Sequence, residues 1–436
     1  MNKRILKLAV PNIISNITIP MLGIIDLGLM GHMGSESYIG AIALGTMIFN
    51  FLYWAFAFLR MGTSGFTAQA YGEKNTPEQA YNLFRALLAG GIGAVLLIIL
   101  QIPIEKASFY LINGSSEVET LAREYFYIRI WAAPATISLF AFTGWFIGMQ
   151  NAKIPMIISI VINILNIAFN LLFIFVFGMK SDGVALGTVL AQYSGLLMAI
   201  YFLFKKYRNV FHHLNWKHIL DVHALNRFFK VNSDIIVRTF CIIGVFTFFT
   251  SKSASMDDTL LAVNSLLLQF LMFFSYFIDG FAYAGEALIG RYLGAKDLIN
   301  FKLAIKKLFH WGIGLAAAYT LIYFVSGSFI LKILTNNITV LNQSESYMIW
   351  VVLIPVASFA TFIWDGIYIG STASKAMRNT MLASTFLLFV PIYFFLMPIW
   401  GNHALWLSML LFMAGRGVFQ TIIAPKSIYR LIKSEE

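Results

Sequence analysis

The sequence predicts an all-α fold: a polytopic membrane protein with twelve transmembrane helices in two six-helix bundles that are related by a parallel repeat. Three observations predict it: an apolar composition, twelve long apolar stretches, and a spacing of 222 residues between similar segments of the two halves. Of the 436 residues, 59% are hydrophobic and only 12% are charged, whereas soluble domains carry about 25% charged residues. Because a soluble fold could not bury this much apolar surface, we expect the lipid bilayer to surround most of the chain.

Each of the twelve stretches reaches the length of about 20 mostly apolar residues that a membrane-spanning helix needs. The first follows Met1-Asn2-Lys3-Arg4 and contains no small-residue cleavage site, so we expect a retained span rather than a signal peptide. The fourth and the eighth are longer than the rest, which favours tilting or extension beyond the bilayer. The predicted spans are residues 8–30, 39–62, 83–104, 121–148, 155–177, 184–204, 229–250, 258–290, 304–325, 346–370, 379–398 and 403–424.

The basic residues lie mainly in alternate loops, which is the positive-inside pattern of membrane proteins. This pattern explains the net charge of +11 without a nucleic-acid partner. The connection between the sixth and seventh spans holds the densest group, namely Lys205, Lys206, Arg208, Lys217 and Arg227. We therefore expect both termini to be cytoplasmic, and the protein to lie as a monomer in the cell inner (plasma) membrane.

Similar residues recur at a fixed offset of 222 along the chain. Gly72 corresponds to Gly294, Gly148 to Gly370, and Lys153 to Lys375. An even number of spans per half keeps both halves in the same orientation, which predicts a parallel repeat of the kind found in transporters. We expect an N-lobe at residues 1–204, a cytoplasmic linker at 205–228, and a C-lobe with the cytoplasmic tail at 229–436.

A polar stripe marks the N-lobe. Asp26 lies deep in the first span, where a charged group costs about 2.5–3.5 kcal/mol on insertion scales and therefore indicates function. Asn163, Asn166 and Asn170 follow one stripe of the fifth span, and Thr188 begins the sixth at a similar depth. A carboxylate in a low-dielectric pocket has a raised pKa and can exchange a proton near neutral pH. The alternative is that these groups only join helices by hydrogen bonds.

A second polar group is predicted near the cytoplasmic ends of the spans. It comprises Arg60, Asp234, Arg238, Asp279, Glu286, Asp365 and Arg416, most of them in the C-lobe. Asp234 and Arg238 are four residues apart, which is the spacing of an ion pair on one helix. Because both signs of charge are present, mutual neutralisation is the simpler interpretation, and an inner gate or a second cation site is the alternative.

Three further features complete the site predictions. Pro11 and Pro20 are hinge candidates in the first span, since proline removes a backbone hydrogen bond and bends a helix. Cys241 is the only cysteine, so no internal disulfide is possible. No metal site is expected, because the linker histidines have no accompanying cage of acids or thiols.

The chain resembles the multidrug and toxic compound extrusion (MATE) transporters of the DinF branch. The resemblance is carried by residues 6–72, which begin LKLAVPNIISN, by Asp234-Ile-Ile-Val-Arg238, by DGFAYAGEALIG (279–290) and by DGIYIGSTASKAMRN (365–379). It implies drug efflux coupled to protons or sodium ions, with a proton site on Asp26 and with Asn166 and Thr188 as its neighbours. Many relatives have an aspartate where this chain has Asn170, which cannot titrate and leaves Asp26 as the only acid there. The span-7 acid of the NorM branch has no clear counterpart, which weakens the sodium interpretation.

The leading hypothesis is therefore a cation-coupled antiporter that exports amphipathic, often cationic organic compounds, with H⁺ or, less well supported, Na⁺ as the coupling ion and no other cofactor. A lipid-linked precursor flippase is the alternative, although such flippases often carry a cationic central cavity. A sugar-facilitator-type transporter would have a GxxxDRxGRR-like run after its second span, where this chain reads Tyr71-Gly-Glu-Lys-Asn-Thr-Pro77. An enzyme is not expected, because the chain holds no HExxH, no GxSxG and no P-loop motif.

Overall fold

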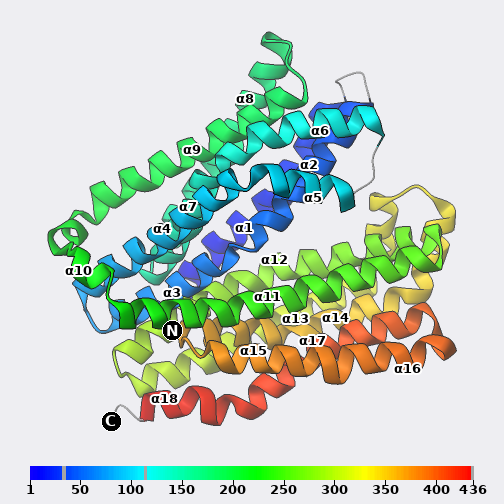
Figure 1. Cartoon of the computed structure of the whole chain (residues 1–436). Coiled ribbons are helices and arrows are strands. Elements are labelled where there is room, and N and C mark those ends of the chain that lie inside the picture. Colours follow the sequence, from blue (N-terminus) through cyan, green and yellow to red (C-terminus); the bar gives the residue numbers. More distant parts are fainter. Residues whose placement is uncertain (32–35, 112–114, 434–436) are drawn as a thin grey trace. The chain divides into compact units, whose positions relative to one another are not determined.

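The computed structural model describes residues 1–31, 36–111 and 115–433, and Figure 1 labels its helices. Within these residues it does not describe the side chains of 19, 22, 24–31, 36, 111, 213, 432 and 433. Every regular element in the described part of the chain is helical, and no strand occurs there. The predicted all-α class is therefore confirmed.

The first half of the chain forms the helices that precede the linker. They are α1 (Asn2–Gly31), α2 (Glu36–Trp54), α3 (Ala57–Gly72), α4 (Thr76–Ile99), α5 (Gln101–Leu111), α6 (Ser116–Arg129), a 3₁₀ turn (Ile130–Ala132), α7 (Ala133–Gly148), α8 (Lys153–Leu171), a π-helical turn η2 (Leu172–Val176) and α9 (Ser181–Lys206). The 3₁₀ helix η3 (Arg208–His213) and α10 (Trp216–Ile219) follow.

The second half contains longer and more continuous helices. They are α11 (Val222–Met256), α12 (Asp258–Gly294), α13 (Leu298–Leu334), α14 (Ile338–Gly370), α15 (Ser374–Ala383), a π-helical turn η4 (Ser384–Phe389), α16 (Val390–Trp400), α17 (Asn402–Ala424), a second π-helical turn η5 (Pro425–Tyr429) and α18 (Arg430–Lys433). α11 begins within the predicted linker and runs for 35 residues. Its polar first turns continue the helix beyond the apolar segment that predicted the span.

Eleven helical stretches among the described residues are long and apolar enough to cross a membrane. They correspond to the predicted second to twelfth spans, usually with polar extensions at one or both ends. For example, Ser37–Gly72 covers the span predicted at 39–62, and Ser116–Gly148 covers that predicted at 121–148. The first predicted span, 8–30, falls on α1, many of whose side chains are not among the described ones. A total of twelve spans therefore stays a prediction.

The helices form two compact units. One comprises Ile14–Arg227, and the other comprises Phe228–Glu436 together with the first part of α1, Met1–Ile13. Within the second unit, Ile5 and Ala9 are fully buried, and Arg4 Nη1 donates a hydrogen bond to the Tyr292 hydroxyl at 2.8 Å. The first turns of the chain therefore belong to the unit formed by its second half.

The repeat predicted from the sequence is visible in the backbone of the two units. Lys74 and Lys296 both have positive φ angles, at 58° and 54°, and they are 222 residues apart. Gln150 (φ 61°) and Thr372 (φ 54°) are separated by the same number. Together they are all of the non-glycine residues with positive φ in the described chain. Since residues with side chains rarely adopt this conformation, its recurrence at one offset shows that both halves end the same helices in the same way.

Close helix packing recurs at the same offset. A Cβ atom at Gly144 in α7 would overlap the backbone of Arg60 in α3. In the other unit, a Cβ atom at Gly366 in α14 would overlap the backbone of Ala282 in α12. In both units a glycine thus lets two helix backbones approach each other without an intervening side chain.

The segment between the two halves packs on the first unit instead of remaining fully solvated. Val210 and Ile219 are buried in the core cluster that contains Trp145. The Arg85 guanidinium donates hydrogen bonds to the carbonyl oxygens of His218 (2.7 Å) and Ile219 (3.2 Å). The predicted linker is therefore part of the folded unit over much of its length.

Candidate functional site

A chain of polar side chains connects α1 and α8 within the unit Ile14–Arg227. The hydroxyl groups of Thr18 and Ser159 lie 3.3 Å apart. The Asn163 amide donates to the carbonyl oxygen of Thr18 at 3.2 Å. α1, which carries Asp26 two turns further on, is thus held to the polar stripe of α8 by direct hydrogen bonds.

The same stripe continues to α9. The Asn170 amide donates to Asn166 Oδ1 at 3.1 Å, and the Asn166 amide donates to the Thr188 hydroxyl at 2.9 Å. All three side chains are buried. Gly187 allows Asn170 to approach α9, because a Cβ atom there would overlap Asn170 Oδ1. The structure therefore brings together four of the five residues that the sequence indicates for the N-lobe.

Asp26 lies in α1, but its side chain is outside the described residues. The hinge candidates of the same helix are described. Helix α1 continues through Pro11 and Pro20, and the boundary between the two units, between Ile13 and Ile14, falls between these prolines. The part of α1 flanked by the two prolines is thus where the helix passes from one unit to the other.

The second unit contains a buried ionic cluster around Asp365 of α14. Its carboxylate accepts hydrogen bonds from Arg238 of α11, from Arg416 of α17 (2.6 Å) and from the Gln420 amide (2.8 Å). Asp279 of α12 lies close enough to Arg416 to attract it electrostatically. Asp365 is 5% exposed and Arg416 is 3% exposed, so the cluster is removed from solvent. Two guanidinium groups already compensate the charge of this carboxylate, so a metal cation there would add a further positive charge to a cluster with an excess of cations.

The ion pair predicted between Asp234 and Arg238 is wrong. Asp234 instead accepts hydrogen bonds from Arg378 (2.6 Å) and from the Ser374 hydroxyl (2.8 Å), both of α15, whereas Arg238 pairs with Asp365. A spacing of four residues makes contact on one helix possible, but packing against α14 and α15 offers each group a partner on another helix.

The remaining members of the predicted polar group lie apart from this cluster or next to it. Arg60 is buried in α3 and belongs to the other unit, Ile14–Arg227, so it is not part of the C-lobe group. Glu286 of α12 is 1% exposed. Gly370 packs against the Glu286 backbone, since a Cβ atom at Gly370 would lie 2.5 Å from the Glu286 carbonyl oxygen. Asp279 and Glu286 each interact with a further residue.

Sequence reasoning missed three charged residues of the first unit. Glu105 is 2% exposed in α5 and pairs with Arg123 of α6. Arg129, the last residue of α6, lies over the rings of Phe49 and Tyr125, at 5.7 and 5.8 Å from the guanidinium carbon to the ring centres. Both arginines fall within the span predicted at 121–148, and a count of ionisable residues in that span would have found them.

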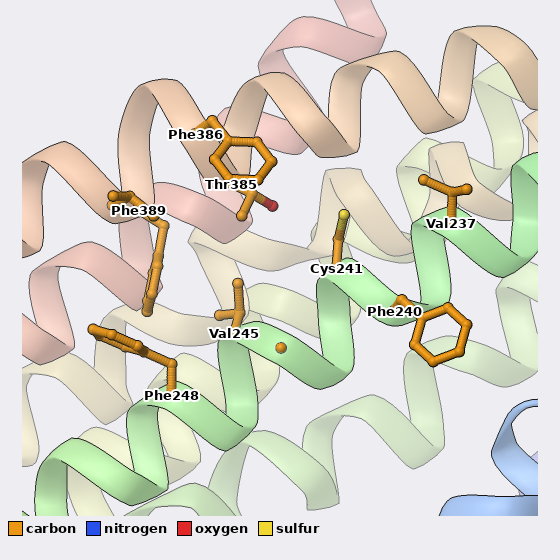
Figure 2. Close-up of a pocket in the computed structure, with 10 residues that line it drawn as sticks. Val237, Phe240, Cys241, Val245, Phe248, Thr385, Phe386 and Phe389 are labelled. Carbon is orange, nitrogen blue, oxygen red and sulfur yellow. The ribbon is translucent and has the colours of Figure 1, made fainter.

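An apolar cavity of about 390 Å³ lies in the second unit between α11 and η4. It is lined by Phe240, Cys241 and Phe248 of α11 and by Thr385, Phe386 and Phe389 of η4, and Figure 2 shows the Cys241 side chain pointing toward η4. Among the lining residues, only Cys241 and Thr385 have polar side chains. The Thr385 hydroxyl donates a hydrogen bond to the Met381 carbonyl oxygen at 2.9 Å. The cavity therefore offers a surface for apolar groups and none for an ion.

The helical architecture, the membrane-spanning stretches and the buried polar groups define a class of protein, a multi-pass membrane transporter. The chain matches the family model MatE over residues 11–172 and 235–395. It therefore belongs to the MatE family, and the resemblance to MATE transporters of the DinF branch is confirmed.

The relatives support this assignment over nearly the whole chain. The chain is 35% identical to DNA damage-inducible protein F of Escherichia coli, across 96% of this chain and 90% of that protein. It is 24% identical to Protein DETOXIFICATION 44, chloroplastic, of Arabidopsis thaliana, across 94% and 80%. It is also 24% identical to the probable multidrug resistance protein NorM of Shewanella oneidensis, across 70% and 67%.

Solved structures share the fold at low sequence identity. The outward-facing conformation of a multidrug resistance MATE family transporter of the MOP superfamily matches with a TM-score of 0.84 and 18% identity, covering 99% of this chain and 96% of that one. The MATE transporter VcmN of Vibrio cholerae in the bent form matches with a TM-score of 0.84 and 18% identity, covering 99% and 97%.

Proposed function

We propose that the protein is a secondary active antiporter that exports amphipathic, often cationic organic compounds in exchange for H⁺. Family membership supports export, because relatives carry the names multidrug resistance protein and multidrug export protein. The positive-inside pattern supports a place in the cell inner membrane with cytoplasmic termini. The shared parallel repeat fits alternating access between two lobes.

The observation that carries the coupling proposal is the hydrogen-bonded chain of the first unit. Asn163 bonds to α1 and Asn166 bonds to Thr188 of α9, so two hydrogen-bonded groups on one stripe of α8 reach its neighbouring helices in an otherwise apolar environment. Such groups are costly inside a membrane unless they serve binding or proton transfer. The stripe reaches α1, whose Asp26 is the carboxyl group that we propose to take up and release the proton.

The ionic cluster of the second unit argues against a second coupling site there. Asp365 is shared by two guanidinium groups, and Asp234 is paired with Arg378. At Asp365, Na⁺ would have to displace two buried guanidinium groups, and at Asp234 it would have to compete with Arg378. We therefore favour H⁺ over Na⁺ and assign the cluster a structural role.

The test is transport of a cationic dye by purified protein in proteoliposomes, with either a pH gradient or a Na⁺ gradient imposed. We expect the pH gradient alone to drive dye movement and Asp26→Asn to reduce this movement at least tenfold. Asp182→Asn is the matched control, because it removes the same charge from the first turn of α9, where the carboxylate accepts a hydrogen bond from the Lys180 backbone amide at 2.7 Å.

Each outcome of this experiment decides one element of the proposal. Dye transport driven only by Na⁺ would replace the coupling ion. Normal pH-driven transport by Asp26→Asn, at equal protein content, would remove Asp26 from the mechanism. Translocation of a lipid-linked precursor without any dye transport would replace the antiporter with a flippase.

A further inference from the structure

Arg129 is a cation in the middle of the membrane-spanning stretch Ser116–Gly148. Among the described residues, it has no partner of opposite charge. It ends α6, about 20 Å along the helix axis from Ser116. Its guanidinium group lies on the faces of Phe49 and Tyr125 and makes no hydrogen bond within the described chain. Its Nε atom is buried and unpartnered. Intramembrane ionisable residues usually face a partner or a polar path, so this arrangement calls for an acceptor.

Two hydroxyl groups beside Arg129 also lack partners. Tyr53 of α2 is 8% exposed, and its hydroxyl lies next to Thr136 of α7 and within electrostatic range of Arg129. The two hydroxyls do not reach hydrogen-bond geometry with each other, and neither oxygen has another partner in the described structure. A buried hydroxyl without a partner loses its hydration without compensation. The ring of Phe49 links these groups within the unit Ile14–Arg227, because its centre lies 5.6 Å from that of Tyr53 and 5.7 Å from the Arg129 guanidinium carbon.

The helices change geometry where these groups meet. α2 ends at Trp54 and α3 begins at Ala57, while a 3₁₀ turn, Ile130–Ala132, separates α6 from α7. Short 3₁₀ stretches inside a helix often mark functional positions. Discontinuous transmembrane helices commonly form the substrate sites of transporters near the middle of the bilayer.

The simpler interpretation is that Arg129 offsets the negative end of the α6 dipole and rests on two aromatic rings. Neither interaction supplies an acceptor to its N–H groups, and neither satisfies the Tyr53 hydroxyl. The guanidinium group has five donors and no acceptor. The described residues supply no acceptor to the buried Nε–H group, and a negatively charged ligand would both accept its hydrogen bond and neutralise the guanidinium.

We propose that Arg129, Tyr53 and Thr136 bind the oxyanion of an amphipathic ligand, with a carboxylate in the fork of the guanidinium group and its apolar body beside the Phe49 and Tyr125 rings. A planar guanidinium matches the two oxygens of a carboxylate, and the two hydroxyls can donate further hydrogen bonds. The ligands of the protein thus include acidic amphipathic compounds as well as cationic ones. Binding at equilibrium needs no ion gradient, so this proposal stands or falls separately from the antiport proposed above.

The experiment is equilibrium binding of 11-(dansylamino)undecanoate to the purified full-length protein, compared with its uncharged methyl ester. The carboxylate should bind at least tenfold more tightly than the ester. Arg129→Gln should remove this preference, Arg129→Lys should retain only part of it, and Tyr53→Phe should weaken carboxylate binding several-fold while leaving ester binding unchanged. Lys106→Gln is the matched control, because it removes an exposed cation of the same unit.

Phosphatidylglycerol added to the same assay identifies the natural source of the oxyanion. Displacement of the carboxylate by this lipid would support the site and assign it to a lipid phosphate, whereas no displacement would support a carboxylate ligand. Equal affinity for acid and ester, or an unchanged preference in a folded Arg129→Gln variant, would overturn the proposal. If Arg129→Gln does not fold, an unchanged preference in Tyr53→Phe would overturn it instead.

Discussion

At the scale of single residues, Asp365 is the group on which the ionic cluster of the second unit depends. Arg238 and Arg416 both donate to its carboxylate. We expect Asp365→Asn to destabilise the protein by about 3–5 kcal/mol, because it leaves two buried cations without their shared acceptor. Arg416→Gln should cost less, because the pair between Arg238 and Asp365 remains neutral. Thermal unfolding in detergent would measure both, and a larger loss for Arg416→Gln would contradict this ranking.

Asp297 gives a prediction of pH dependence outside the spans. Its carboxylate accepts a hydrogen bond from the Asn300 amide nitrogen of the backbone (3.0 Å) and another from the Asn300 side chain (2.7 Å) at the start of α13. These bonds lower the pKa of Asp297 below its ordinary value of 3.8. The stabilisation from the ionised cap is therefore present above pH 4 and is lost as the pH falls through the lower pKa of the folded state.

The corresponding cap of α4 is Asn75, which does not titrate and accepts from the Glu78 amide at 3.1 Å. Asp297→Asn should therefore keep the cap of α13 and abolish the loss of stability in acid. Asn75→Asp should introduce such a loss of stability at the cap of α4. Asp297→Ala should cost about 1 kcal/mol at neutral pH. Melting temperatures between pH 3 and pH 6 would test this, and parallel curves for wild type and Asp297→Asn would count against it.

At the scale of the helices, the glycine contacts give a prediction that applies equally to both units. Gly144→Ala and Gly366→Ala should each prevent normal packing, because the added methyl group would overlap a backbone carbonyl group that has no rotamer to change. Gly91→Ala and Gly314→Ala are the controls, since a Cβ atom at either position meets nothing within 4 Å. Membrane abundance and melting temperature would be compared, and normal values for the first two variants would show that α3 and α7, or α12 and α14, can separate freely.

The helices were largely predictable from the sequence, and their partners were not. The repeat offset of 222 follows from residues such as Gly148 and Gly370, which recur because both halves make the same close contact. The stripe of asparagines in α8 was predictable because helical spacing alone places them on one face. The partner of Asp234 was not, because it lies on α15, 144 residues away along the chain. Arg129 itself was predictable from the count of ionisable residues in its span, but its position beside Tyr53 and Thr136 was not, because these two residues belong to other helices.

At the scale of the whole molecule, the chain does not divide at one point into two halves. Residues 1–13 of α1 pack with the second half, while the rest of the helix belongs with the first. Sequence reasoning places all of α1 in the N-lobe because connectivity is the only guide to assignment in a linear chain. Helix α1 is therefore built into both units, and Asp26 lies in the part that belongs to the unit Ile14–Arg227. If Asp26 takes up a proton as we propose, a resulting change in α1 would act on both units.

The docking of the first residues of α1 on the second unit can be tested at Gly280. A Cβ atom at this position of α12 would overlap Ile13 and approach the Ala9 carbonyl oxygen to 2.8 Å. Gly280→Val should therefore displace residues 2–13 and speed backbone hydrogen exchange in that segment at least tenfold, while exchange in α8 and α9 stays unchanged. Gly314→Val introduces the same side chain into a helix at a position with nothing within 4 Å, and it should leave exchange at wild-type rates. Equal exchange of residues 2–13 in both variants would show that the close contact at Gly280 does not hold the start of α1 on the second unit.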